Sequence, residues 1–79
     1  MTYVYILQSE VGLSKHYVGI SSDPARRLDE HNNGKSIHTN KHKPWKIVIS
    51  IGFDDAAKAA AFERYLKSGS GRAFAKKHF

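Results

Sequence analysis

The chain has 79 residues, no cysteine and a formal net charge of +6, from 13 Lys and Arg against 7 Asp and Glu. This length predicts one domain with a modest core, since such a chain buries only about 60% of its unfolded surface. Disulfides and a thiolate zinc site are excluded, and without a secretory signal or an apolar run of roughly 20 residues we expect a cytoplasmic protein with no membrane span.

Two strands are expected near the N-terminus. Residues 3–7 are aromatic and β-branched, and residues 16–20 form a second apolar run. The polar residues between them include Gly12, which indicates a turn. The pattern predicts an antiparallel hairpin.

A helix is predicted to follow the hairpin. Asp23 can cap its free N–H groups, and Pro24 suits its first position. We expect this helix to end at residues 33–34, which are Asn-Gly. Residues 35–44 have no apolar periodicity, so they are expected to form a basic loop.

The second half of the chain predicts one more strand and two helices. Residues 45–53 favour a strand, an alanine-rich helix capped by Asp54 or Asp55 should end near residues 68–69, and a short helix should cover about residues 70–77. The resulting order is β-β-α-β-α-α. It predicts an α+β fold with a small three-stranded antiparallel sheet flanked by helices.

Basic residues are clustered along the chain. Residues 35–46 hold four lysines and two histidines without an acid, and residues 64–79 hold five Lys and Arg without an acid. Such clusters suit phosphate contacts and make a polyanion the first partner to consider. The alternative is a basic surface that only keeps the protein in solution.

Arg27 and His31 are predicted to share a helix face, because they are four residues apart. A guanidinium beside an imidazole would suit a phosphate, although a solvated polar face fits the same spacing. Tyr5 and Tyr17 are on adjacent predicted strands, where they are either core residues or a converging pair of hydroxyls. A tyrosine that acts as a base needs a cation nearby to lower its pKa, and Arg27 is the candidate.

Glu63 borders the apolar stripe of the alanine-rich helix, beside Ala59 and Leu66. A carboxylate there is unfavourable unless it is paired or binds a metal. The alternative is an ordinary ion pair with Lys67, four residues away. Among the seven acids, Glu63 is the best candidate for a metal ligand, whereas Asp29 and Glu30 are expected to face solvent.

Four segments together resemble the motifs of the GIY-YIG endonuclease superfamily. Residues 3–5 (Tyr-Val-Tyr) and 17–19 (Tyr-Val-Gly) resemble its two naming motifs, with Tyr3 in place of glycine. Residues 21–31 resemble its arginine-bearing helix, and residues 62–67 resemble its metal-binding helix. The resemblance is closest to small stand-alone members and implies one GIY-YIG-like nuclease domain over residues 1–79.

The resemblance implies a metal-dependent DNA endonuclease that hydrolyses phosphodiester bonds in DNA repair or recombination. Tyr17 would be the general base on the attacking water, with Tyr5 assisting. Arg27 would stabilise charge on the scissile phosphate, and His31 would belong to the same site. Glu63 would hold one divalent ion, Mg²⁺ or Mn²⁺.

The implied partner is duplex or branched DNA. The basic side chains expected to contact it are Arg26, Lys35, Lys41, Lys43, Lys67 and Arg72. Two alternatives stay open. One is a nucleic-acid-binding module of the same fold without catalysis, and the other is a nuclease subunit that needs a protein partner for specificity.

Overall fold

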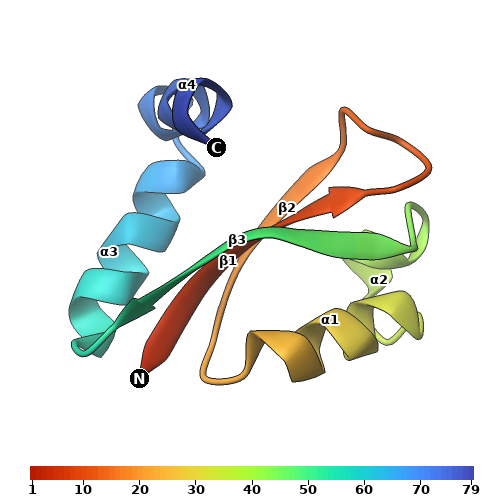
Figure 1. Cartoon of the computed structure of the whole chain (residues 1–79), viewed down its shortest axis with the longest axis horizontal. Coiled ribbons are helices and arrows are strands. Elements are labelled where there is room, and N and C mark those ends of the chain that lie inside the picture. Colours follow the sequence, from red (N-terminus) through yellow and green to blue (C-terminus); the bar gives the residue numbers. More distant parts are fainter.

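The computed structural model describes residues 1–79 and has a three-stranded antiparallel sheet at its centre. The middle strand, β1 (Thr2–Ser9), pairs with β2 (His16–Ser21) on one side and β3 (Trp45–Phe53) on the other. Figure 1 shows α1 (Pro24–Asn32) and α2 (Ile37–Asn40) toward one end of the sheet. It shows α3 (Ala56–Leu66) and α4 (Gly69–His78) toward the other. The predicted α+β class and sheet are confirmed.

The helices begin where their capping residues indicate. The Asp23 carboxylate accepts a hydrogen bond from the Arg26 N–H at 3.1 Å, with proline at the start of α1. The Asp55 carboxylate accepts from Ala57 N–H at 2.8 Å, so Asp55 is the cap of α3. Each cap satisfies N–H groups that have no partner inside the first helical turn. None of the four helices combines the length and apolar character needed to cross a membrane.

The prediction of a continuous loop over residues 35–44 is wrong, because α2 forms one helical turn within it. The backbone N–H of Asn40 donates to the Ser36 carbonyl at 3.0 Å. Thr39 on this turn is buried, and its carbonyl accepts from Trp45 Nε1 at 2.8 Å. Contacts with distant residues stabilise a turn that has no apolar periodicity of its own. The element order is therefore β-β-α-α-β-α-α.

The side chains of β1 alternate between two separate cores. Val4 and Ile6 pack with α3, where Ala59 is a buried contact. Tyr5 and Leu7 point to the opposite face and pack with Trp45 and Leu28. Because successive side chains of a strand point to opposite faces, β1 connects the two cores.

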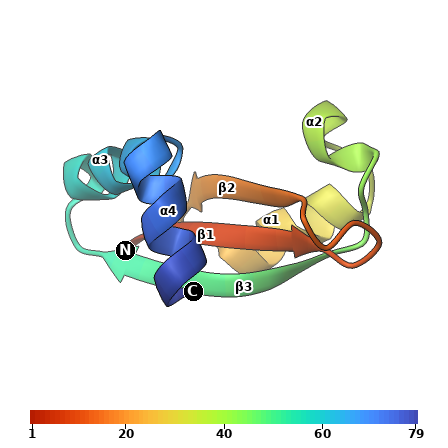
Figure 2. The same ribbon diagram turned by 90° about the horizontal axis from the view of Figure 1, so that it is seen from above.

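The last helix, α4, is attached closely to the end of α3. A Cβ atom at Gly71 would lie 1.8 Å from the Tyr65 carbonyl oxygen, so only glycine permits this approach. A Cβ atom at Gly69 would meet nothing within 4 Å. The helix is seen end-on in Figure 1 and runs across the strand direction in Figure 2.

This contrast predicts that Gly71→Ala lowers the free energy of unfolding by about 1–3 kcal/mol, because the new methyl group forces the α3–α4 junction apart. Gly69→Ala is the matched control and is expected to change stability little. Urea unfolding followed by circular dichroism measures both variants. Equal stability of the two variants would contradict the close packing at Gly71.

Candidate active site

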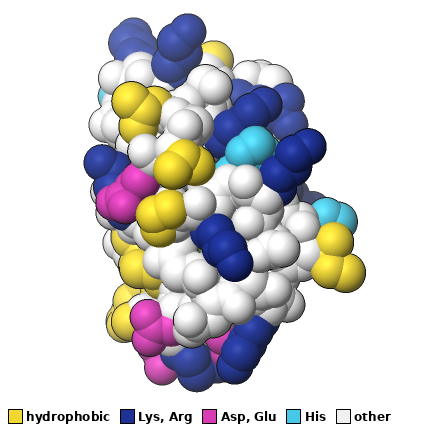
Figure 3. All heavy atoms as spheres, turned by 90° about the vertical axis from the view of Figure 1, so that its right-hand side faces the viewer, with side chains coloured by type: hydrophobic (Ala, Val, Ile, Leu, Met, Phe, Trp, Pro, Cys, Tyr) yellow, Lys and Arg dark blue, Asp and Glu magenta, His cyan; other side chains and the backbone are white.

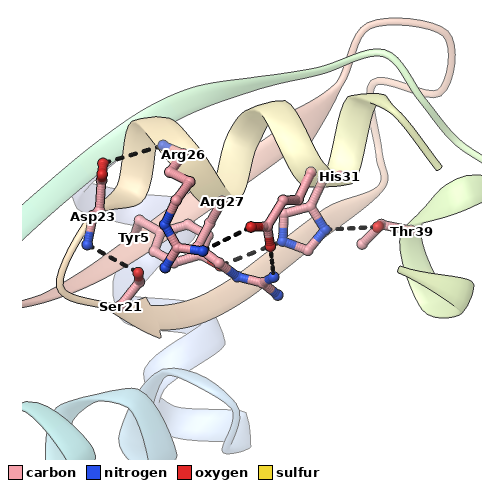
Figure 4. A network of polar contacts seen from close by, with 8 residues as sticks. Tyr5, Ser21, Asp23, Arg26, Arg27, His31 and Thr39 are labelled. Carbon is pink, nitrogen blue, oxygen red and sulfur yellow. Dashed lines mark hydrogen bonds and ion pairs between the residues drawn. The ribbon is translucent and has the colours of Figure 1, made fainter. Parts of the chain in front are cut away.

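Two tyrosines and a histidine converge on the face of the sheet that α1 covers. The antiparallel register of β1 and β2 pairs Leu7 with Tyr17 and Tyr5 with Gly19. Because Tyr5 and Leu7 share a face of β1, Tyr17 lies on the same face of the sheet as Tyr5. The Tyr5 hydroxyl oxygen lies 3.3 Å from His31 Nε2, as Figure 4 shows. The rings of Tyr17 and His31 are 4.8 Å apart between centroids, and those of Tyr5 and Tyr17 are 6.4 Å apart.

Gly19 makes this convergence possible. A Cβ atom at this position would lie 2.4 Å from both Cζ and the hydroxyl oxygen of Tyr5. The Tyr5 ring therefore lies directly over the glycine, in space that any other residue would occupy. The third residue of the Tyr-Val-Gly segment is thus needed to position a tyrosine on the neighbouring strand.

Arg27 and His31 share one face of α1, and both approach Tyr5 (Figure 4). The Arg27 guanidinium donates to the Glu30 carboxylate, which also accepts from Arg26 at 2.7 Å. Hydrogen bonding by Arg27 holds the pKa of Glu30 below its usual value. The expectation that Glu30 faces solvent is wrong in part, since its side chain is partly buried and orients the arginine. The three-residue spacing of Arg27 and Glu30 is the sequence signal for this pair.

Burial and charge set the protonation of the cluster. Burial raises the pKa of Tyr5, and hydrogen bonding by Arg27 only partly opposes this effect. Arg27 lowers the pKa of Tyr5 as expected, but burial outweighs this effect, so the net pKa is raised and Tyr5 stays protonated at pH 7. Burial lowers the pKa of His31, and the positive charge of Arg27 lowers it further. His31 is consequently a neutral imidazole at pH 7.

Thr39 is a site residue that the sequence did not reveal. Its hydroxyl oxygen lies 2.7 Å from His31 Nδ1, and its side chain is almost completely buried. Both ring nitrogens of His31 therefore have hydroxyl partners, and the neutral ring donates to one of them and accepts from the other. No local pattern marks Thr39, because its partner is on another helix.

Glu63 lies on α3 and forms no hydrogen bond with this cluster. Its carboxylate accepts a hydrogen bond from Lys67 Nζ at 3.2 Å. This is the ion pair that the four-residue spacing offered as the alternative to a metal site. After burial and Tyr17, its negative charge also contributes to the raised pKa of Tyr5. No hydrogen bond joins Glu63 to Tyr17, Arg27 or His31, and no group of three metal-ligating side chains forms.

One carboxylate nevertheless fits the expected ion. Mg²⁺ commonly keeps several waters and is bound through one or two carboxylates together with substrate phosphates. The Glu63 side chain is 19% exposed, so its oxygens are accessible from solvent. A site of this kind needs no further protein ligand before the substrate is bound.

The basic residues expected to contact DNA fall into two groups. Lys35, Lys41 and Lys43 are exposed around α2, where Figure 3 shows basic side chains predominating over acidic ones. Arg26 belongs to neither group, because it lies in the first turn of α1, at the end away from α2 (Figure 4), where it is paired with Glu30. The other group is Lys67 and Arg72, near the α3–α4 junction.

This geometry predicts that His31 titrates below the ordinary histidine pKa of about 6.5 and holds one tautomer when neutral. Nitrogen-15 NMR of the imidazole measures both properties. Thr39→Ser keeps the hydroxyl and should keep one tautomer, whereas the nearly isosteric Thr39→Val should give a mixture. A His31 pKa above 6.5 would contradict the effects of burial and Arg27, and an unchanged single tautomer in Thr39→Val would contradict the role of Thr39.

The chain is similar to several known proteins. Over 66 residues it is 39% identical to the structure-specific endonuclease subunit SLX1 of Chaetomium globosum, covering 76% of this chain and 20% of that protein. The corresponding protein of Schizosaccharomyces japonicus is 39% identical over 64 residues, which cover 75% of this chain and 23% of that protein. The UPF0213 protein of Streptococcus pneumoniae is 35% identical over 66 residues, which cover 82% of this chain and 65% of that protein.

The chain thus spans about one fifth of the length of the SLX1 relatives. Residues 1–77 match the family described as the GIY-YIG catalytic domain. The match includes both tyrosine segments, the arginine-bearing helix and Glu63. The chain therefore belongs to the GIY-YIG catalytic domain family.

Proposed function

We propose that this protein is a metal-dependent endonuclease that hydrolyses phosphodiester bonds of DNA in repair or recombination. The observation that carries the proposal is the convergence of Tyr5, Tyr17, Arg27 and His31 on one face of the sheet. Membership of a family of catalytic domains supports it. So do the names of the SLX1 relatives, which are structure-specific endonuclease subunits.

Arg27 is the proposed phosphate-binding group. Hydrogen bonding to Glu30 raises the pKa of its guanidinium, so the positive charge is permanent. Its side chain is 31% exposed, which leaves donors available to a substrate. A guanidinium held in advance stabilises the negative charge that develops on a phosphate in the transition state.

Tyr17 is the proposed immediate base for the attacking water. Tyr5 stays protonated and orients its neighbours through its hydroxyl. Neutral His31 can take up a proton near pH 7, and it lies beside both tyrosine rings. In the tautomer whose Nδ1–H donates to Thr39, its Nε2 accepts a hydrogen bond from the Tyr5 hydroxyl, which holds the imidazole in place beside Tyr17.

Glu63 would hold one Mg²⁺ or Mn²⁺ ion, which when bound supplies positive charge to the leaving 3′ oxygen. Lys67 contacts only Oε2 of Glu63, and an ion bound through that oxygen would displace Lys67. A pair of this kind, four residues apart on a helix, is worth only about 0.3–0.5 kcal/mol. Lys67 is then free to contact a phosphate, as its exposed side chain allows.

Duplex or branched DNA is the proposed substrate. The side chains proposed to bind its backbone are Arg26, Lys35, Lys41, Lys43, Lys67 and Arg72. A protein partner that supplies specificity is also proposed, because the SLX1 relatives are named as subunits.

Glu63→Gln is expected to abolish metal-dependent cleavage of branched and plain duplex DNA while DNA binding survives. Asp54→Asn, an exposed acid on the loop before α3, is the matched control and should cleave normally. Gel assays with Mg²⁺, Mn²⁺ or chelator measure cleavage, and fluorescence anisotropy measures binding. Normal cleavage by Glu63→Gln would remove this residue from the mechanism. Binding without cleavage by the unaltered protein would favour the non-catalytic module or the partner-dependent subunit.

Arg27→Gln is expected to lower kcat about 100-fold or more with a small change in KM, because the charge that it removes acts mainly in the transition state. Arg26→Gln is the neighbouring control, since Arg26 also binds Glu30 but is more exposed. Its kcat should change only a few-fold. Steady-state kinetics on a labelled branched substrate separates these outcomes. A change confined to KM would make Arg27 a positioning contact.

A further inference from the structure

A groove lies between the sheet and α4, on the opposite face from the tyrosine cluster. Its volume is about 890 Å³, within the range of ligand-binding pockets. Its floor is apolar and includes Ile6, Val18 and Leu66. Val48 and Phe79 line it as well, and each is 39% exposed, so apolar surface stays open to a ligand.

The groove is open because α4 is held away from the strands. Gly71 fixes the start of α4 against the Tyr65 carbonyl at the end of α3. From there α4 runs across the strand direction, as Figure 2 shows, and its main contacts are with α3. The half of this sheet face near the β1–β2 turn is therefore left without a covering helix.

The charged side chains that line the groove are all basic. Lys67, Arg72 and Lys76 line it, together with His16, and no acidic side chain does. Arg72 and Lys76 form no ion pair. Cations along an apolar floor complement a ligand that has phosphates on one side and flat apolar surfaces on the other.

The groove leads to the proposed catalytic residues. Tyr17 contributes to its lining, since β2 is the edge strand between the groove and the tyrosine cluster. Lys67 lines it too and is the ion-pair partner of Glu63. A strand that passes the proposed base and the proposed metal ligand would therefore continue into the groove.

We infer that the groove binds an unpaired DNA strand next to the cleaved bond, with phosphates on Arg72 and Lys76 and bases on the apolar floor. In a duplex, base faces are covered by stacking, so only an unpaired strand can place them against Phe79 and Val48. This inference rests on the proposed function only in identifying the bound strand with the one that is cut. It makes flapped or branched DNA the favoured substrate class.

The first test is metal-free binding of a short fluorescein-labelled oligothymidylate, followed by anisotropy in chelator. Arg72→Gln/Lys76→Gln should flatten the salt dependence of log K by roughly 1.4, about 0.7 for each phosphate that the variant no longer neutralises. Phe79→Ala should weaken binding about fivefold or more, because it removes a base-stacking surface. Circular dichroism checks that both variants fold.

The matched control is Arg64→Gln/Lys77→Gln, which also removes one arginine and one lysine charge, from α3 and α4, at positions outside the groove. It should leave the salt slope nearly unchanged. Equal effects of the two double variants would overturn the inference, because binding would then depend on net charge alone.

NMR of the isotope-labelled protein locates the strand directly. Oligothymidylate should shift the amide resonances of Val18, Arg72 and Ala75, with smaller shifts around α2. Shifts confined to α1 and α2 would overturn the inference. So would concentration-dependent shifts at the groove without DNA, which would mean that a second copy of the chain occupies it.

Cleavage assays separate the groove from the proposed function. If the groove binds the strand but no DNA is cut, the endonuclease fails and the groove stands. If DNA is cut but the Arg72→Gln/Lys76→Gln variant keeps the same preference for flapped over plain duplex DNA, the groove fails and the endonuclease stands.

Discussion

The placement of the Tyr5 ring over Gly19 is the constraint on which the site depends. The ring is buried between β1, β2 and α1, and it fills the space that a side chain on β2 would need. This packing fixes the position of the Tyr5 ring against β2 and directs its hydroxyl toward His31. Arg27 approaches the same hydroxyl, and the Tyr17 ring lies beside the Tyr5 ring. A small sheet can thus hold a polar cluster at a fixed geometry because one glycine admits one aromatic ring.

Opposing electrostatic effects determine what this cluster can do. Burial disfavours charge on both Tyr5 and His31, so these two side chains are neutral at pH 7, whereas Arg27 is charged. Arg27 keeps its charge through Glu30, on the same helix and closer to solvent. The arrangement separates a neutral, proton-accepting interior from a cationic outer edge. That separation is what phosphodiester hydrolysis requires, because a proton has to leave the water while charge builds on the phosphate.

The edge strand β2 connects the two sides of the protein. Tyr17 belongs to the proposed catalytic cluster and also contributes to the lining of the groove near α4. Lys67 joins the same two regions from α3, since it pairs with Glu63 and lines the groove. A chain of 79 residues thereby combines a proposed reaction centre with a proposed strand-binding surface. The sharp α3–α4 junction at Gly71 is what keeps the groove open.

Sequence alone determined the features that depend on neighbours along the chain. Apolar alternation predicted the strands, Asp23 and Pro24 predicted the start of α1, and a spacing of four predicted the shared face of Arg27 and His31. Tertiary structure decided the one-turn helix that carries Thr39, the raised pKa of Tyr5, and the groove beneath α4. Each of these depends on burial or on contacts between residues far apart in sequence. Local pattern does not contain that information, because the free energy of such contacts exists only once the elements have packed.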